Sequence, residues 1–181
     1  LRVIYHPNPL EASRVGELVA SEKATMIFAT PTFLQGYLRK CEPEQMRTLR
    51  LVITGAEKLP AKLAEAFAEK FGVYPIEGYG TTELSPAVSI NVPPIVADTG
   101  RKSGKTGSIG QPLPGVTAKI VDPVTGELQA EDQEGLLLIK GPNVMLGYLN
   151  EPGRTQEVIN HGYYNTGDMA RMDAEGYLFI T

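Results

Sequence analysis

The sequence predicts an α/β fold, with a partial parallel-sheet α/β lobe followed by a small β-rich subdomain that resembles a distorted barrel. Two observations lead to this prediction. Short apolar runs alternate with amphipathic segments in the first half of the chain, which is the pattern of βαβ units and a largely parallel sheet. Beyond a glycine-rich stretch at residues 98–110, short β-like runs with turn signals replace that alternation. We therefore expect two domains, at residues 1–97 and 98–181.

Four short runs predict strands in the first half. Residues 2–5 form a β-like run that ends at a turn-rich segment. Residues 25–29 are continuously apolar, which is typical of a strand covered on both faces, and residues 50–54 repeat that pattern. Residues 74–77 are a weaker strand candidate.

Helices are expected between these strands. Apolar residues recur at helical spacing over residues 10–23, and a proline at the start favours a helix over residues 31–37. The clearest helix covers residues 60–71, since it begins at a proline and ends before Gly72. Its apolar face is predicted to consist of Leu63, Ala64, Phe67 and Phe71.

The second half predicts mainly strands. Residues 118–121 and 136–139 are short apolar runs, and residues 169–180 predict a hairpin whose turn lies at 173–176. Only residues 151–159 have a helical pattern there.

Composition excludes several classes of protein. The 181 residues carry 17 Lys and Arg against 21 Asp and Glu, and this acidic balance argues against general nucleic-acid binding. The single cysteine, Cys41, cannot form an internal disulfide and is expected to be a passive, partly buried thiol. His6 and His161 lie in turn-like segments without a nucleophile pattern, and we expect surface histidines.

The most informative stretch covers residues 77–83. Two glycines on either side of an aromatic residue allow a backbone to approach a flat ligand while the ring stacks on it. Hydroxyls of Thr81 and Thr82 can bond phosphate oxygens, and Glu83 can hold a hard cation. A simpler interpretation is a turn after a strand, in which Thr82 caps a helix and Glu83 lies in its first turn.

Two further stretches could bind a ligand. Asp168 follows Thr-Gly at an expected loop-to-strand junction, where it could bond ribose hydroxyls or form an Asx-type turn. Residues 54–57 directly follow a predicted parallel strand, and ligands bind at the carboxyl ends of such strands. An ordinary strand-to-helix loop is the alternative there.

In this order and at these separations, the segments resemble the core motifs of the adenylate-forming superfamily, which includes acyl-CoA and acyl-ACP synthetases, luciferases and peptide-synthetase adenylation domains. Residues 78–83 resemble its aromatic-Gly-x-Thr-Glu motif. Residues 135–141, continuing to 147–149, resemble its next core motif, and residues 164–168 resemble its aromatic-x-Thr-Gly-Asp motif.

The amino-acid sequence of residues 54–59, 82–86 and 88–93 is most similar to one branch of that superfamily. This branch is the bifunctional acyl-ACP synthetase/2-acylglycerophosphoethanolamine acyltransferase of bacteria. Glu57 replaces the small residue that many members of the superfamily carry, and the sequence around it resembles that of this branch.

The resemblance implies a two-step reaction. The carboxylate of a fatty acid attacks the α-phosphate of Mg-ATP to give acyl-AMP and pyrophosphate, and a thiol of acyl carrier protein or coenzyme A then takes the acyl group. By resemblance, Thr82 bonds the α-phosphate, Glu83 holds Mg²⁺, and Asp168 binds the ribose. Tyr79 stacks on the adenine, and Phe33 borders the acyl pocket. The nucleotide-binding residues that the resemblance implies are Gly55, Ala56, Glu57, Glu77, Gly78, Tyr79, Gly80, Thr81, Thr82 and Asp168.

The resemblance also predicts parts that this chain lacks. We expect the phosphate loop upstream of Leu1, and the hinge, the Arg-bearing motif and a small domain with the catalytic Lys beyond Thr181. The chain is then a piece of the large N-terminal domain, inactive alone, within a cytoplasmic parent that this branch would associate with the inner membrane. A non-catalytic nucleotide-binding or interaction module with the same fold stays an alternative.

Overall fold

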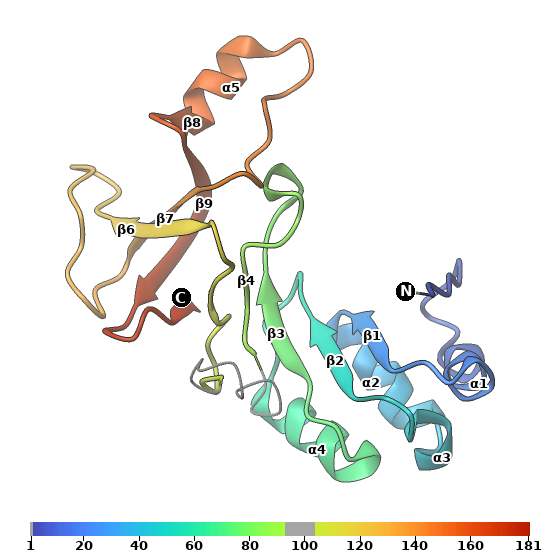
Figure 1. Cartoon of the computed structure of the whole chain (residues 1–181). Coiled ribbons are helices and arrows are strands. Elements are labelled where there is room, and N and C mark those ends of the chain that lie inside the picture. The colour runs from blue at the N-terminus through green and yellow to red at the C-terminus, as the bar shows by residue number, and fades with distance from the viewer. Residues whose placement is uncertain (1, 93–103) are drawn as a thin grey trace. The chain divides into compact units, whose positions relative to one another are not determined.

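The computed structural model describes residues 2–92 and 104–181 of the chain (Figure 1). Its contacts divide the chain into two compact units, Leu1–Ile76 and Glu77–Thr181. This division falls earlier in the sequence than the expected boundary between residues 97 and 98. That boundary and residues 98–103 of the glycine-rich stretch lie outside the described residues, so a domain boundary there stays a prediction.

The first unit combines two parallel strands with four helices. Strands β1 and β2 pair in parallel, with Met26 opposite Leu51 and Ala29 opposite Thr54. The short helix α3 was not predicted, and α2 continues three residues past its predicted end at residue 37. In chain order the elements are α1 (Ala12–Glu22), β1 (Met26–Ala29), α2 (Pro31–Lys40), α3 (Pro43–Met46), β2 (Leu51–Thr54) and α4 (Ala61–Phe71).

Helix α4 confirms the periodicity of its sequence. Its buried residues are the predicted Leu63, Ala64, Phe67 and Phe71. The helix ends at Gly72, which has φ +74° and caps the last turn in a left-handed conformation that glycine adopts without strain.

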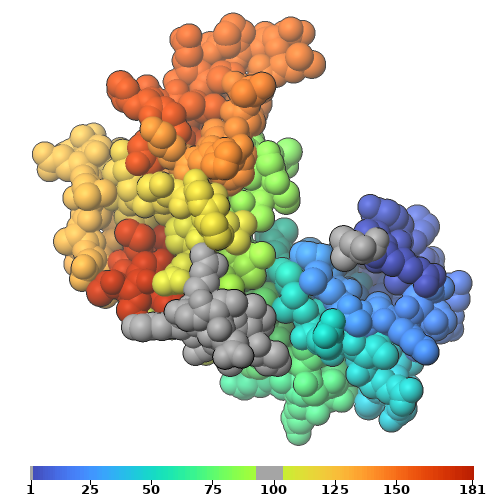
Figure 2. All heavy atoms as spheres, in the orientation of Figure 1, coloured from blue at the N-terminus to red at the C-terminus, as the bar shows by residue number. Residues whose placement is uncertain are grey.

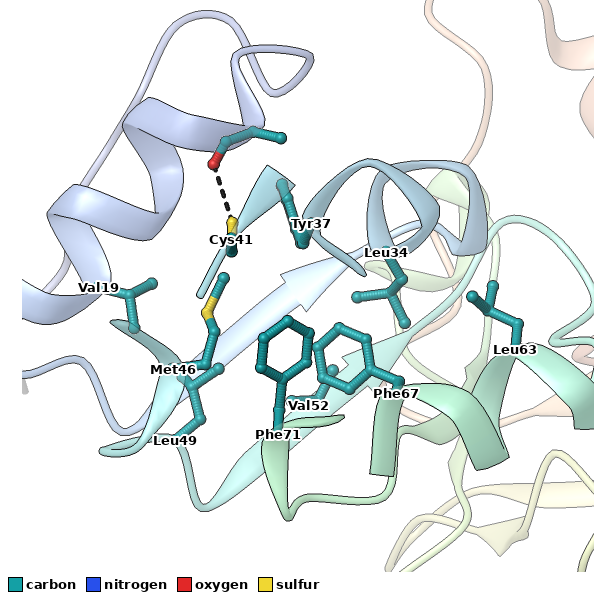
Figure 3. Packing of buried hydrophobic residues seen from close by; sticks show 11 residues of the cluster. Val19, Leu34, Tyr37, Cys41, Met46, Leu49, Val52, Leu63, Phe67 and Phe71 are labelled. Carbon is teal, nitrogen blue, oxygen red and sulfur yellow. Dashed lines mark hydrogen bonds between the residues drawn. The ribbon is translucent and has the colours of Figure 1, made fainter. Parts of the chain in front are cut away.

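The core of the first unit is built from residues of its helices α1 to α4 together with β2 and its flank (Figure 3). The rings of Phe67 and Phe71 lie 4.7 Å apart at 58°, a tilted arrangement that aromatic pairs favour. The Cys41 thiol donates to the Ala12 carbonyl oxygen over 3.2 Å and is fully buried, rather than partly buried as predicted.

Two expectations for this unit were wrong. Strand β1 is not covered on both faces: Ile27 packs against the core, whereas Phe28 on the opposite face is 70% exposed. Successive side chains of a strand point to opposite faces, and the helices of this unit cover only one. Residues 2–5 form no strand, since no backbone pairing orders them; Tyr5 is 88% exposed there.

The second unit consists mainly of antiparallel strands. Strands β3, β4 and β5 pair in that order, and a second sheet has the order β10-β9-β7-β6, with β8 paired to β9. The elements are β3 (Ile76–Tyr79), the 3₁₀ helix η1 (Thr82–Leu84), β4 (Ser89–Ile90), β5 (Gln111–Pro112), β6 (Thr117–Val121), β7 (Gly135–Lys140), α5 (Pro152–Val158), β8 (Ile159–Asn160), β9 (Tyr163–Met172) and β10 (Leu178–Ile180).

These two units confirm the predicted fold class, an α/β part with parallel strands and a β-rich part with a curled antiparallel sheet. The predicted hairpin is formed by β9 and β10, with Met172 opposite Leu178. The predicted helix at residues 151–159 is α5. Strand β3 begins two residues later than expected, because Pro75 has no N–H group to donate to a neighbouring strand.

No helix among the described residues has the length and apolar character needed to span a membrane. A surface hollow of about 570 Å³ in the first unit is lined by residues of α1 and α3 and their flanking turns, and it contains none of the predicted site residues.

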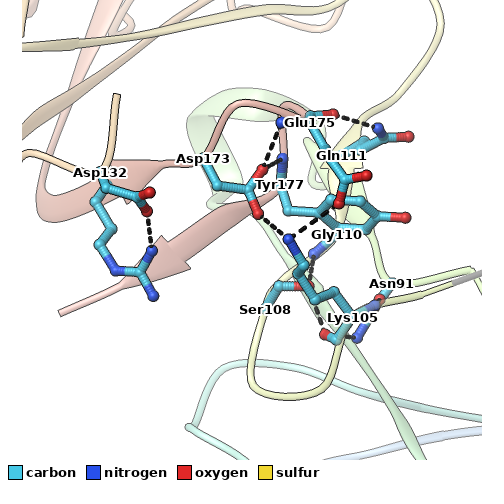
Figure 4. A network of polar contacts seen from close by, with 10 residues as sticks. Asn91, Lys105, Ser108, Gly110, Gln111, Asp132, Asp173, Glu175 and Tyr177 are labelled. Carbon is cyan, nitrogen blue, oxygen red and sulfur yellow. Dashed lines mark hydrogen bonds and ion pairs between the residues drawn. The ribbon is translucent and has the colours of Figure 1, made fainter. Parts of the chain in front are cut away.

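A polar cluster around Lys105 ties together distant segments of the second unit (Figure 4). The Lys105 ammonium contacts the carboxylates of Asp173 and Glu175, in the turn between β9 and β10. Asp173 also accepts hydrogen bonds from the backbone N–H groups of Glu175 and Tyr177, at 3.0 and 2.9 Å. Burial alone would raise the pKa of Asp173, but Lys105 and these N–H groups outweigh it and lower that pKa.

We expect Asp173→Asn to lower the free energy of unfolding by about 1–3 kcal/mol at pH 7, because a hydrogen bond to a charged group is lost and the new amide faces an ammonium. A lowered carboxyl pKa stabilises the fold above pH ~4, and this contribution is lost as the pH falls through the folded-state pKa. Urea unfolding of the chain between pH 3 and 7 measures both effects. Asp132→Asn is the control, since its ion pair with Arg171 is exposed and should contribute at most about 1 kcal/mol.

Candidate nucleotide and metal site

The segment from β3 through η1 carries most of the predicted site residues. Glu77, Gly78 and Tyr79 belong to β3, while Thr82 and Glu83 begin η1. The structure gives Gly80 a steric reason that the sequence did not reveal, since a Cβ there would lie 1.6 Å from the Pro86 carbonyl oxygen. Any other residue at this position would force the turn apart.

The simpler interpretation of this turn is confirmed in one part and wrong in another: Glu83 lies in the first turn of η1, but Thr82 does not cap it. Thr81, rather than Thr82, occupies the N-cap position of η1, and its side chain makes no capping hydrogen bond. Leu84 is fully buried and anchors the short helix in the core. The polar residues beside it are therefore fixed by Leu84 and the backbone, and Thr82 is exposed.

Glu83 is held by a residue of the second motif. Its Oε1 accepts a hydrogen bond of 2.9 Å from the Tyr148 hydroxyl, and its carbonyl oxygen accepts one of 2.8 Å from the Met145 N–H. The N–H of Glu83 itself and then the Tyr148 hydroxyl lower the pKa of the Glu83 carboxyl, so it is ionised at neutral pH. Burial and the charge of Glu83 raise the pKa of the neighbouring Tyr164 to about 12.

Asp168 lies inside strand β9, not at the expected loop-to-strand junction. A bulge places it there: Leu136 and Leu138 of β7 pair with Met169 and Asn165 of β9, so one residue of β7 faces three of β9. Bulges of this kind redirect side chains, and the middle residue, Gly167, has φ +77°.

The bulge itself contains two side-chain turns. The Gly167 N–H donates to Asn165 Oδ1 over 3.0 Å, and the Asp168 N–H donates to Thr166 Oγ1 over 3.1 Å. The Asx-type turn therefore forms at Asn165. The carboxylate of Asp168 accepts a hydrogen bond from the Tyr79 hydroxyl instead.

The contact between Tyr79 and Asp168 joins the first and third motifs. Burial and then the hydrogen bond to Asp168 raise the pKa of Tyr79, so the phenol remains a donor at neutral pH. One carboxylate oxygen of Asp168 is thereby fixed, and a carboxylate has further lone pairs that can accept a ligand hydroxyl. Stacking of the Tyr79 ring on a base stays a prediction.

The remaining predicted residues lie in the first unit. Gly55, Ala56 and Glu57 follow β2, and Ala56 adopts φ +68°. Glu57 Oε2 accepts hydrogen bonds from the Thr32 hydroxyl at 2.8 Å and from the Thr32 N–H at 3.3 Å, which ties this loop to the first turn of α2. The ring of Phe33 packs partly against the core of the unit.

Glu83 offers a single carboxylate, which suits a metal site that is completed by the phosphates of a bound nucleotide. The described residues contain no cluster of three or more His, Cys, Asp or Glu side chains that could enclose a metal. Mg²⁺ in nucleotide sites is usually held by one or two carboxylates together with substrate phosphates. A single ionised carboxylate such as Glu83 fits that arrangement.

Sequence reasoning missed Tyr148 as a site residue. Its hydroxyl contacts Glu83 across a separation of 65 residues. The signal that could have found it was its place in the second motif, where a tyrosine directly follows Gly147.

Fold, motifs and site geometry together define the class. The chain matches the AMP-binding enzyme family over residues 1–149, and it therefore belongs to that family. Among curated relatives, it is 34% identical to a long-chain-fatty-acid–CoA ligase of Bacillus subtilis and 37% identical to one of Escherichia coli, over 96% of this chain and 30% of each relative. The chain thus spans about a third of the length of these relatives.

Solved structures give the same result. Apo MatB from Rhodopseudomonas palustris superposes with a TM-score of 0.81 at 30% identity, over 94% of this chain and 32% of that one. The anthranilate CoA ligase AuaEII in complex with anthranoyl-AMP superposes with a TM-score of 0.86 at 27% identity, over 98% of this chain and 33% of that one.

Proposed function

We propose that this chain forms part of the active site of an ATP-dependent ligase that activates a carboxylic acid as acyl-AMP and transfers the acyl group to a thiol. The observation that carries the proposal is that two motif carboxylates, Glu83 and Asp168, are each bound by a tyrosine hydroxyl. The relatives' names support the chemistry, since they include CoA ligases and a structure with an acyl-AMP.

In this proposal each carboxylate has its own task. Asp168, oriented by Tyr79, accepts hydrogen bonds from the ribose hydroxyls of ATP. Glu83 holds Mg²⁺, which when bound neutralises phosphate charge during attack by the substrate carboxylate. The exposed hydroxyl of Thr82 bonds an oxygen of the α-phosphate. Positioning and charge neutralisation dominate when one anion attacks another, so ordered groups of this kind suit the reaction.

We further propose, from the resemblance, that Gly55, Ala56 and Glu57 of the first unit and Glu77 and Gly78 of the second are nucleotide-binding residues, and that Phe33 borders the acyl pocket. Thr32 orders the loop at Glu57 through two hydrogen bonds. The β- and γ-phosphates would be bound by parts of the parent protein that this chain does not contain. A cytoplasmic location stays a prediction.

A fatty acid is the proposed substrate, and coenzyme A or acyl carrier protein the proposed thiol. The names of the curated relatives favour coenzyme A. The acyl-ACP synthetase/acyltransferase branch is a second candidate, because the sequence of residues 54–59, 82–86 and 88–93 resembles that of its members.

The test uses the full-length protein that contains this chain. It is incubated with ATP, Mg²⁺ and carboxylic acids of increasing chain length, and acyl-AMP is measured by mass spectrometry. Coenzyme A and acyl carrier protein are then supplied separately as acceptors. We expect acyl-AMP with fatty acids and its consumption by one of the two thiols. Nucleotide binding without acyl-AMP for any acid would favour a non-catalytic module instead.

A further inference from the structure

The loop between β7 and α5 is fastened to the turn that carries Glu83. The Asn143 amide donates to the carbonyl oxygens of Leu84 and Ala87, at 3.1 and 3.0 Å. Together with the bonds from Met145 and Tyr148 to Glu83, these contacts attach one loop to both the backbone and the side chain of η1. The second motif therefore supports the first.

Polar contacts, rather than burial in a core, orient Tyr148. Its neighbours Leu146 and Leu149 are 104% and 89% exposed, so apolar burial does not draw this part of the loop inward. Figure 2 shows the surrounding segment, in orange, projecting from the rest of its unit. Tyr148 is nevertheless half-buried, with its hydroxyl on Glu83.

Helix α5 fixes the tyrosine from the other side. The Tyr148 N–H donates to Thr155 Oγ1 over 2.9 Å, and the Thr155 hydroxyl in turn donates to the Glu151 carbonyl oxygen over 2.9 Å. The Arg154 guanidinium lies 4.6 Å from the centre of the Tyr148 ring, within the range of a cation–π contact. A Cβ at Gly147 would come within 2.9 Å of the Thr155 side chain, so the close approach requires glycine.

We infer that Tyr148 is a positioning residue for the Glu83 carboxylate that would hold the cation, acting through the hydrogen bond from its hydroxyl to Glu83 Oε1. This inference rests on the proposed function. A carboxylate with one oxygen fixed loses rotational freedom before the cation arrives, so binding costs less ordering. Groups that hold a metal ligand in place typically contribute about 10- to 100-fold in metal affinity.

The test compares Mn²⁺ binding by the full-length protein in the presence of a non-hydrolysable ATP analogue, followed by electron paramagnetic resonance. We expect Tyr148→Phe, which keeps the ring under Arg154, to weaken Mn²⁺ binding by about 10-fold or more. The Mg²⁺ concentration that half-saturates acyl-AMP formation should rise in parallel, with the KM for the acid unchanged. Tyr163→Phe is the matched control, because its ring lies against Lys119 and Lys140 in the same unit.

A double-mutant cycle separates positioning from a merely structural role. In a Glu83→Gln background, Tyr148→Phe should cause no further loss of Mn²⁺ affinity, since the side chain that Tyr148 positions no longer carries the negative charge that binds the cation. Equal Mn²⁺ affinity of the wild type and Tyr148→Phe would overturn the inference, as would an equal loss in both backgrounds. If Mn²⁺ affinity falls in Tyr148→Phe but the wild type forms no acyl-AMP, the proposed function is overturned and this inference is supported.

Discussion

Replacing Glu83 by Gln in the full-length protein should lower the rate of acyl-AMP formation by about 10²-fold or more, the usual effect of removing one preorganised electrostatic group. Glutamine has the same shape, and its carbonyl oxygen can still accept the hydrogen bond from Tyr148. The fold of the turn should therefore persist while the negative charge is lost. The rate is measured with saturating ATP over a range of Mg²⁺ concentrations, and the melting temperature is measured beside it.

The control for this substitution is Glu157→Gln, which removes an exposed glutamate from α5 in the same unit. It should leave both the rate and the melting temperature unchanged. If a well-folded Glu83→Gln protein adenylated its substrate at a near-normal rate, Glu83 would not be the metal-binding carboxylate.

The largest effect on stability is expected for Phe67→Ala. Phe67 is fully buried between α4 and the rest of the first core, and its ring lies against Phe71. Truncating such a ring leaves a cavity and typically costs about 3–5 kcal/mol. Whole domains are stable by only about 5–15 kcal/mol, so this change should unfold much of the first unit at moderate urea concentrations.

Urea unfolding of the chain, followed by circular dichroism, measures that loss. The matched control is Glu65→Ala, an exposed position on the same helix, where we expect a change of at most about 0.5 kcal/mol. A loss below about 1 kcal/mol for Phe67→Ala would show that the core around α4 packs more loosely than the structure indicates.

Local sequence patterns were sufficient to predict those elements whose structure is decided by residues close together in the sequence. Helix α4 is the clearest case, because a 3.6-residue periodicity, a proline before it and a glycine after it all lie within one short segment. The hairpin of β9 and β10 was predictable for the same reason. By contrast, the exposed face of β1 depends on what covers the sheet, which a run of apolar residues does not specify.

The geometry of the candidate site could not be predicted either, because it depends on residues that are distant in the sequence. The residue types of Glu83 and Asp168 were evident from their motifs, but their hydrogen-bond partners lie 65 and 89 residues away in the sequence. No local pattern links Tyr148 to Glu83. Likewise, Asp168 is directed by a bulge that arises only when β7 and β9 pair.

The central claim is that this chain contributes to a site that joins a carboxylate to AMP. It is tested most directly by exchange of labelled pyrophosphate into ATP, catalysed by the full-length protein in the absence of any thiol. We predict exchange that requires both Mg²⁺ and a fatty acid and that falls about 10²-fold or more in Glu83→Gln. The 181-residue chain alone should show no exchange. Absence of exchange by a well-folded full-length protein across a series of carboxylic acids would contradict the claim.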